Sequence, residues 1–319
     1  MEYITLGASG LSVSRLCIGS LTVSPVQANL TAERAAEVLA YAFSKGIRFT
    51  DTAQYYENYP LIRRALQLYR GDVVISTKTY AYTREMAMEA VEQARRELDR
   101  DVIDIFMLHE QESYETLRGH REALEYLFEC KSRGIIRAVG ASMHHIAAVH
   151  GVIALYRRGI PLDVIHPIFN RGGYGIADGT IEEMQAAVSE AHALGIGVFA
   201  MKVLGGGHLF RDAASAFDFA LDQPYIDAVA VGMQSEAEID ANIAYFDTRT
   251  FPSEAKSALQ KKSRRLHIED YCEGCGACVR RCAQGALSVL NGHAAVHAEK
   301  CVLCGYCSRV CPLFAIKVL

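Results

Sequence analysis

The segments Ile47-Arg-Phe-Thr-Asp51 and Val73-Val-Ile-Ser-Thr-Lys78 each contain a short β-rich run that ends on a charged residue. Six further runs of this kind lie along the chain, and all eight are spaced 27 to 33 residues apart. The other six end near Ser20, His109, Ser142, Asn170, Met201 and Gly232. Helical patterns fill the intervals, as in 31–45, where apolar residues recur on one face before Gly46.

Eight strand-plus-helix units in about 250 residues predict an α/β fold, the (β/α)8 TIM barrel. An open doubly wound sheet is the alternative. It rarely needs eight evenly spaced units, and no G-x-G-x-x-G motif follows the first strand. Gly205-Gly-Gly207 follows the seventh strand, where barrels often bind phosphate.

Polar residues mark several of the predicted strand ends. Asp51, Lys78 and His109 end strands two, three and four, and Tyr56 lies in the loop after strand two. Each alone has an ordinary structural interpretation, such as a helix cap or a solvated side chain. Because active sites of this fold lie at the carboxyl ends of the strands, the four together predict a catalytic set.

The chain here resembles the aldo-keto reductase family. The resemblance covers about residues 1–245 and rests on Phe49-Thr-Asp-Thr-Ala-Gln-Tyr-Tyr56, Ser76-Thr-Lys78, Asp104-Ile-Phe-Met-Leu-His109 and Val139-Gly-Ala-Ser142. The segment 6–14 is similar to the family's N-terminal hairpin, which closes the bottom of the barrel. The resemblance implies an oxidoreductase whose catalytic tetrad is Asp51, Tyr56, Lys78 and His109.

The tetrad's chemistry follows from its residue types. A tyrosine pKa of about 10 is too high for easy proton transfer at neutral pH. We expect the Lys78 ammonium to lower the pKa of Tyr56, with Asp51 holding Lys78 by charge-assisted hydrogen bonds. Tyr56 would then exchange a proton with the carbonyl or alcohol oxygen, which His109 orients.

The nicotinamide contacts that the resemblance implies are only partly present. Ser142 and Asn170 remain, whereas Met143, His166 and Met201 replace the family's usual residues. Lys202 stands where a neutral residue is more usual. The family's adenine-binding segment aligns with Gly232, Met233, Gln234, Glu238 and Asn242. Glu238 stands where NADPH-dependent members carry a basic residue, which favours NAD(H) over NADP(H). Glu238 also completes a capping box with Ser235, so a purely structural role stays open.

The C-terminal cysteines form the strongest motif of the chain. Cys272, Cys275, Cys278 and Cys282 are spaced C-x2-C-x2-C-x3-C, and Cys301, Cys304, Cys307 and Cys311 repeat that spacing before Pro312. This is the bacterial two-cluster ferredoxin pattern, in which the fourth cysteine of each run binds the other cluster.

Two [4Fe-4S] clusters are therefore expected. The first has Cys272, Cys275, Cys278 and Cys311 as ligands, and the second has Cys301, Cys304, Cys307 and Cys282. Zinc is the rival, but it usually needs two separated pairs. Disulfides fit poorly without a secretion signal. The two other cysteines, Cys17 and Cys130, are expected in the core.

Charge divides the chain as the cysteines do. Residues 254–319 hold ten Lys and Arg against five Asp and Glu, although the whole chain carries a net charge of −4. We predict a barrel at 1–250, a basic linker at 251–265 and a small α+β ferredoxin-like domain at 266–319. The linker's Lys261, Lys262, Arg264 and Arg265 are either a solvated surface or a docking patch for an acidic electron carrier.

Composition narrows the function further. The net charge suggests no nucleic-acid partner, and no apolar run reaches the 18 residues of a membrane helix. Reduced cysteines and the absence of a signal-like N-terminus indicate a cytoplasmic protein.

Three functions stay open. The first is a reductase that exchanges electrons between the barrel site and the clusters. The second is an NADH-dependent carbonyl reductase with structural or sensory clusters, and the third is a non-catalytic electron-transfer or redox-sensing subunit. Because hydride moves as a pair and clusters pass single electrons, a flavin is a candidate converter, although no flavin motif is identified. Ferredoxin or flavodoxin is the candidate external carrier.

The substrate is expected to be a small carbonyl compound or alcohol. The candidates to line its pocket are Tyr55, Tyr59, Tyr80, His144 and Phe169.

Overall fold

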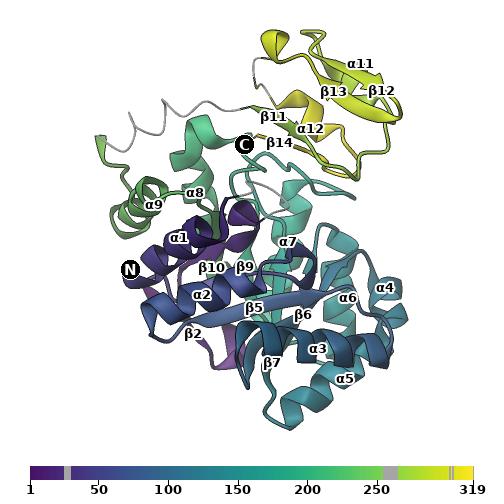
Figure 1. Ribbon diagram of the computed structural model, residues 1–319. Helices are drawn as coiled ribbons and strands as arrows, with labels where there is room; N and C mark the ends of the chain where they lie inside the picture. The colour runs from purple at the N-terminus through teal and green to yellow at the C-terminus, as the bar shows by residue number, and fades with distance from the viewer. Residues whose placement is uncertain (25–29, 254–264, 302, 304, 319) are drawn as a thin grey trace.

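The computed structural model describes residues 1–24, 30–253, 265–301, 303 and 305–318. Eight parallel strands close into a barrel in the order β10-β3-β4-β5-β6-β7-β8-β9 (Figure 1). Their bounds are Leu16–Gly19 (β3), Phe49–Asp51 (β4), Val74–Thr79 (β5), Ile103–Gln111 (β6), Ile136–Met143 (β7), Val164–Pro167 (β8), Gly197–Ala200 (β9) and Ala228–Gly232 (β10). The prediction of a TIM barrel is confirmed.

Helices cover the outside of the barrel. They are α1 (Ala32–Ser44), α2 (Tyr59–Tyr69), α3 (Arg84–Leu98), α4 (Tyr114–Gly119), α5 (Arg121–Ser132), α6 (Ile146–Arg157), α7 (Ile181–Ala193), α8 (Ala213–Leu221) and α9 (Glu236–Thr248). Local sequence sets their ends. The Thr31 hydroxyl caps α1, and Gly46 follows the helix with a left-handed φ of 95°. The apolar faces of these helices pack on the strands in one large core, which includes Cys130.

The barrel interior is closed from below by the N-terminal hairpin. Strands β1 (Tyr3–Thr5) and β2 (Ser12–Ser14) pair antiparallel. Leu6 and Leu11 of this hairpin pack against Phe49 and Phe199, which point into the barrel. Cys17 belongs to the same buried cluster. The bottom of the barrel is thus filled with apolar side chains, so polar chemistry is confined to the opposite end.

In its described residues, the C-terminal region forms two small sheets, two short α-helices and the 3-10 helix η5 (Ala298–Lys300). Strands β11 (Leu266–Ile268) and β14 (Ile316–Val318) pair antiparallel, as do β12 (Leu287–Leu290) and β13 (His293–Val296). Helices α11 (Ala277–Arg281) and α12 (Tyr306–Arg309) each begin after a glycine with left-handed φ, Gly276 and Gly305. Most of the predicted basic linker, including Lys261, Lys262 and Arg264, lies outside the described residues.

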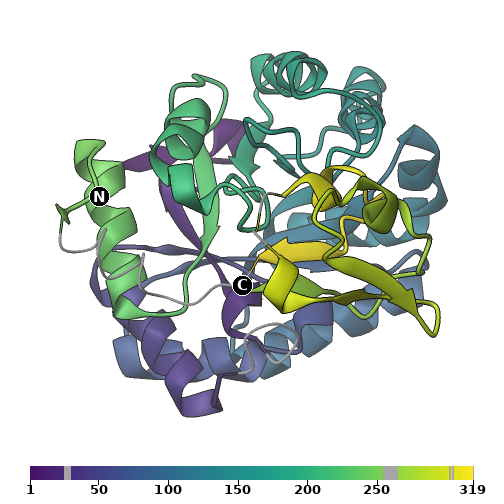
Figure 2. The ribbon, with the colours of Figure 1, turned by 90° about the horizontal axis from the view of Figure 1, so that it is seen from above.

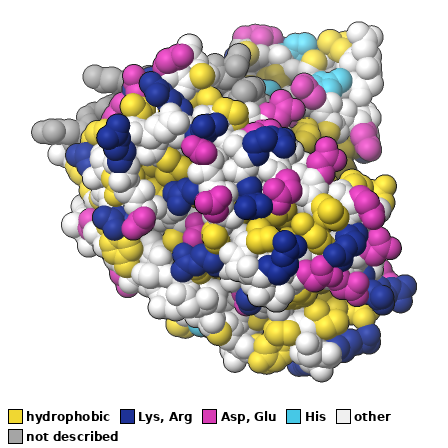
Figure 3. All heavy atoms as spheres, turned by 60° about the horizontal axis from the view of Figure 1, so that its bottom comes forward, with side chains coloured by type: hydrophobic (Ala, Val, Ile, Leu, Met, Phe, Trp, Pro, Cys, Tyr) yellow, Lys and Arg dark blue, Asp and Glu magenta, His cyan; other side chains and the backbone are white. Residues whose placement is uncertain are grey.

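The C-terminal region lies over one side of the barrel, as Figure 2 shows from above. Strand β14 contacts the glycine loop after β9, where the Val318 amide donates to the Gly206 carbonyl at 2.9 Å. On the face shown in Figure 3, basic and acidic side chains are interspersed. Among the described residues, no helix is both long and apolar enough to span a membrane.

Candidate active site and metal centre

A buried ion pair forms the base of the candidate active site. Asp51 ends β4 and Lys78 lies on the neighbouring strand β5, so the two side chains meet at the same end of the barrel. The Lys78 Nζ donates to both carboxylate oxygens of Asp51, at 2.8 and 2.7 Å, and to the Thr52 carbonyl at 2.7 Å. Burial opposes ionisation of Asp51, but Lys78 and His166 hold its pKa well below the usual value.

Tyr56 stands beside this pair in the short helix η3 (Gln54–Tyr56). The Lys78 Nζ lies 5.3 Å from the centre of its ring. The expectation that Lys78 lowers the pKa of Tyr56 is wrong. Burial raises that pKa well above its usual value, and the carboxylates of Asp51 and Glu110 raise it further. The reason is geometric: Lys78 spends its three N–H bonds on Asp51 and Thr52, and Asp51 neutralises its charge.

His109, on β6, completes the predicted set. Its ring lies 5.8 Å from that of Tyr56 and stacks on Tyr80 at 4.4 Å. Burial, with the nearby Lys78 charge, lowers the pKa of His109 to about 3, so the imidazole is neutral at physiological pH. Its buried Nδ1 has no hydrogen-bond partner among the described residues. A neutral imidazole with an unused nitrogen is suited to bind a substrate oxygen.

His166 was predicted as a nicotinamide contact, and in the structure it also lies beside the Asp51–Lys78 ion pair. Its Nε2 lies 3.6 Å from the Asp51 carboxylate, and its Nδ1 is 2.6 Å from the Phe199 carbonyl. The ring stacks on Phe199 at 3.9 Å. Because Nδ1 faces a carbonyl it carries a proton. Nε2 faces the Asp51 carboxylate. Sequence reasoning missed this role, since it depends on strands β4 and β8 facing each other across the barrel.

Among the residues that the structure describes, Ser142 and Asn170 keep hydrogen-bond donors for a nicotinamide. The Ser142 hydroxyl accepts from the Glu110 amide at 2.8 Å and still has its own hydrogen to donate. Asn170 gives one amide hydrogen to the Tyr174 carbonyl at 2.9 Å and keeps the other. Met201, half-buried, follows β9 and bridges to Ile168. A planar carboxamide needs hydrogen-bond donors beside an apolar surface, and this donor set fits one.

Lys202 is held at the barrel mouth in a strained conformation. Its φ is 55°, in the left-handed region that non-glycine residues seldom adopt. Its Nζ lies 3.0 Å from His144 Nε2 and 5.0 Å from the centre of the Phe314 ring. Glu110 is strained in the same way, with φ 48°. Although partial burial raises the pKa of Glu110, the neighbouring imidazoles and Lys202 hold it at about 2.

Two of the candidate pocket residues lie elsewhere. Tyr59 is buried and its hydroxyl bonds Thr77 at 2.6 Å, whereas Phe169 stacks on Phe219 in the core. Tyr55 and Tyr80 are exposed and pack edge to face at 6.3 Å. Sequence position alone could not separate the buried residues of this set from the exposed ones. Side chains that are neighbours in a loop, or at the beginning of a helix, can point in opposite directions.

The predicted adenine-binding segment opens helix α9. Met233 is fully buried, and Asn242 is nearly so. Ser235 caps α9 as predicted, but the Glu238 carboxylate accepts from the Gln234 amide at 2.8 Å rather than from Ser235. The expected capping box is therefore only half formed. Gly232 leaves room for the Thr22 side chain, whose methyl group would lie 2.2 Å from a Cβ at this position.

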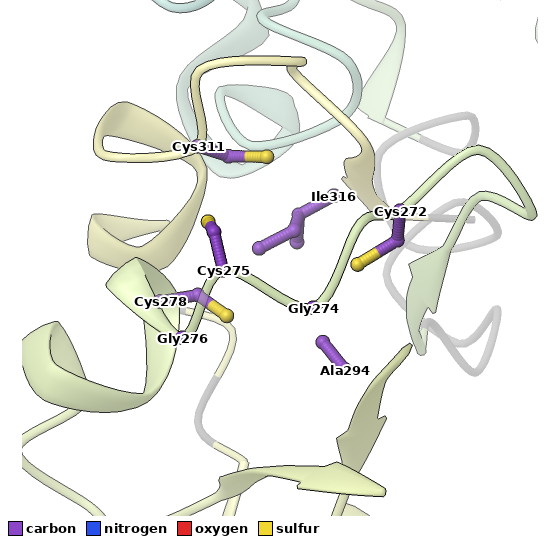
Figure 4. A pocket seen from close by; sticks show the side chains of 8 residues that line it. All are labelled: Cys272, Gly274, Cys275, Gly276, Cys278, Ala294, Cys311 and Ile316. Atoms are coloured by element: carbon purple, nitrogen blue, oxygen red, sulfur yellow. The ribbon is translucent and has the colours of Figure 1, made fainter. Parts of the chain in front are cut away.

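Four cysteines line a small cavity in the C-terminal region (Figure 4). They are Cys272, Cys275, Cys278 and Cys311, the set expected to bind the first cluster. Gly274, Gly276, Ala294 and Ile316 complete the lining. A Cβ on Gly274 would meet the Gly292 carbonyl oxygen at 2.3 Å. Among the described residues, no three His, Cys, Asp or Glu side chains converge as ligands of one ion. Thiols spaced around a cavity suit a cluster with four corners.

The two cysteine runs are equivalent in their backbone support. The Ala286 amide donates to Cys282 Sγ at 3.3 Å, and the Ala315 amide donates to Cys311 Sγ at 3.2 Å. Such bonds favour the thiolate that an iron ligand requires. Cys301 and Cys307, of the second set, lie in the same small core, whereas Cys304 is outside the described residues.

Comparison with known proteins decides the family. Residues 15–215 match the model of the aldo/keto reductase family. The chain belongs to the aldo/keto reductase family. Residues 265–312 of this reductase match a 4Fe-4S dicluster domain, which supports iron–sulfur clusters in the C-terminal region. Members of this family are oxidoreductases that use a nicotinamide cofactor.

Relatives of this reductase are distant. It is 26% identical to aldo-keto reductase YhdN of Bacillus subtilis over 53% of its length, and spans about half of that relative (54%). It is 22% identical to L-galactose dehydrogenase of Arabidopsis thaliana, covering 76% of this chain and 88% of that one. The fold is similar to a putative aldo-keto reductase of Pseudomonas aeruginosa, with a TM-score of 0.64, 23% identity and coverage of 77% and 94%.

Proposed function

We propose that this reductase interconverts a carbonyl and an alcohol at Asp51, Tyr56, Lys78 and His109, and exchanges the electrons with two [4Fe-4S] clusters. The observation that carries the proposal is the fully bonded Asp51–Lys78 pair beside Tyr56, at the end of the barrel next to the cysteine domain. Reduction of an aldehyde or ketone to its alcohol takes two electrons and two protons. Two clusters that each pass one electron match that count.

The chain's own residues handle the proton and the oxygen. Tyr56, protonated because its pKa is raised, donates its phenolic proton to the carbonyl oxygen during reduction and takes it back during oxidation. The neutral His109 ring binds the same oxygen and orients it. Asp51 fixes Lys78, and the bonded pair holds the base of the site beside the Tyr56 ring.

A nicotinamide, when bound at the barrel mouth, would supply the electron pair and one proton as hydride. Ser142 and Asn170 would hold its carboxamide, with His166, Met201 and Lys202 around the ring. Gly232, Met233, Gln234, Glu238 and Asn242 would hold the adenosine end. A carboxylate at Glu238 disfavours a 2′-phosphate, so we propose NAD(H) rather than NADP(H).

Single electrons and pairs must be converted into each other if both regions serve one reaction. A flavin is the candidate converter, and reduced ferredoxin or flavodoxin is the candidate one-electron carrier. Acid-denatured protein that releases a yellow, fluorescent isoalloxazine would support the flavin, and a colourless supernatant would remove it from the proposal.

The proposal is tested by anaerobic turnover of cluster-loaded protein with a carrier reductant and a panel of small carbonyl compounds. The keto or lactone product of L-galactose, the sugar in the Arabidopsis relative's name, belongs in the panel. Cys275→Ser removes a ligand of the first set and should abolish carrier-driven turnover. Cys130→Ala, in helix α5, is the matched control and should retain it. Near-normal turnover in Cys275→Ser would contradict the proposal.

A second function is favoured by one observation: the tetrad is assembled wholly by barrel strands β4, β5 and β6 and the short helix η3. Such a site can work as an NADH-dependent carbonyl reductase with clusters that are structural or sensory. In that case Cys275→Ser would leave NADH-driven turnover intact while iron content falls.

A further inference from the structure

Strand β14 connects the first expected cluster site to the barrel. One side of this strand belongs to the cysteine domain, because the Ile316 side chain lines the cavity of Cys272, Cys275, Cys278 and Cys311 (Figure 4). The other side belongs to the barrel. The Ile316 carbonyl lies 3.2 Å from His208 Nε2, and the Val318 amide donates to Gly206. A single three-residue strand thus joins the first cavity to the loop after β9.

Phe314 anchors this strand in the barrel. Only 2% of its surface is exposed, and it packs in the large core of the barrel rather than in the small core of the cysteine domain. Its ring lies edge to face with His144 at 6.5 Å and beneath the Lys202 ammonium at 5.0 Å. The next residue, Ala315, donates its amide to Cys311 Sγ. The residue packed in the barrel is therefore adjacent in the chain to the one that bonds a first-set thiol.

Strained backbone converges at the same place. Phe314 has a φ of 48° and Lys202 a φ of 55°, and their side chains are in contact. Non-glycine residues in this backbone region are strained and persist only where the surroundings fix them. Glu110, the third strained residue, lies beside Lys202 and accepts from the Tyr80 hydroxyl at 2.5 Å. The contact between Lys202 and Phe314 thus connects the cysteine domain to the aromatic group around His109.

We infer that the cavity of Cys272, Cys275, Cys278 and Cys311 is the barrel-facing electron site, and that Phe314 and strand β14 are positioning elements that couple it to the active site. This deepens the proposed function and rests on it for the passage of electrons. The coupling itself is a structural claim. The second cysteine set would exchange electrons with the first set and with the external carrier.

The test is an EPR-monitored redox titration of the cluster-loaded full chain. Cys275→Ser and Cys301→Ser identify the signals of the first and second set. Phe314→Ala should then shift the midpoint potential of the first-set signal, because it releases β14, loosens the Ala315 bond to Cys311 and admits water to the cavity. We expect about a tenfold change in its oxidised-to-reduced ratio at fixed potential, about 59 mV for one electron.

Two further variants make the result decisive. Leu313→Ala removes the neighbouring exposed apolar side chain and should shift neither signal. Phe314→Leu keeps an apolar side chain and should give a smaller shift of the same sign, which covers the case in which Phe314→Ala does not fold. Equal shifts of both signals, a shift of the second set alone, or no shift would overturn the inference. None of these readouts requires turnover, so failure of the proposed function would be seen separately as absent carrier-driven reduction with the potential shift intact.

Discussion

The barrel mouth and the cysteine domain are built in contrasting ways. At the mouth, Lys78 and Asp51 satisfy each other, and Lys78 is 1% exposed with all its donors used. In the cysteine domain, four thiols surround a cavity, and the core is small and partly made of Cys278 and Cys307. In the barrel site, the buried charges are satisfied by other protein groups. In the cysteine domain, the thiols are expected to be satisfied by the iron that they bind. The stability of each region should therefore respond differently to the same treatments.

Removal of iron should have the largest effect and act on one region. A domain of about 50 residues rarely has a sufficient apolar core, and ligand binding then supplies folding free energy. We expect anaerobic chelation to expose the backbone amides of 266–318 to hydrogen exchange while strands β3 to β10 keep their protection. Hydrogen exchange followed by mass spectrometry measures both regions in one sample. Equal loss of protection in the barrel would show that the two regions fold as one unit.

Replacement of Tyr56 by Phe should lower turnover by about 10²–10⁴-fold, the usual contribution of a positioned proton donor. The fold, iron content and EPR signals should not change, because the phenol is not a cluster ligand. Tyr55→Phe, in the neighbouring exposed tyrosine, is the control and should keep its rate. A Tyr56→Phe rate near that of the control would remove Tyr56 from the mechanism.

Lys78→Met should cost about 3–5 kcal/mol of barrel stability, because it leaves the Asp51 carboxylate buried without its partner. Lys131→Met breaks a more exposed pair with Asp163 and should cost about 0–1 kcal/mol. Denaturant unfolding followed by circular dichroism compares them. Adding Asp51→Asn to Lys78→Met should restore part of the loss, and no restoration would show that packing rather than charge carries the cost.

The pH dependence of the turnover rate should be the smallest effect, and it should differ between carbonyl reduction and alcohol oxidation. The raised pKa of Tyr56 keeps the phenol protonated, so the reduction rate should be flat between about pH 6 and 8. Oxidation needs the phenolate, so its rate should rise with pH over that range. His109, with a pKa of about 3, contributes no step there. A reduction rate that falls through an inflection near pH 7 would contradict the assignment of these states.

The local sequence pattern predicted the barrel well, because the spacing of apolar residues within each strand and helix indicates that element by itself. All eight expected strand ends lie within three residues of the observed ones, and the run ending near His109 continues to Gln111. The tetrad side chains also lie together, because parallel strands bring their carboxyl ends to one edge. The role of these residues stays a proposal, as do the domain limits at 1–250, 251–265 and 266–319.

Features that depend on tertiary contacts could not be predicted from the sequence. The pKa of Tyr56 was expected in the wrong direction because the three bonds of Lys78 are visible only in space. Phe314 reads equally well as a core residue of the cysteine domain, and nothing local indicates that it is buried in the barrel. The left-handed conformations of Glu110, Lys202 and Phe314 likewise arise where distant segments meet.

The central claim is that electrons pass between the two-electron reaction at the barrel site and the one-electron clusters at the cysteines. An anaerobic titration with NADH tests this claim most directly. The cluster-loaded protein is followed by its broad visible iron–sulfur absorbance. The account predicts bleaching that Cys275→Ser interrupts. Absence of bleaching by NADH, in protein whose clusters dithionite still reduces, would contradict it.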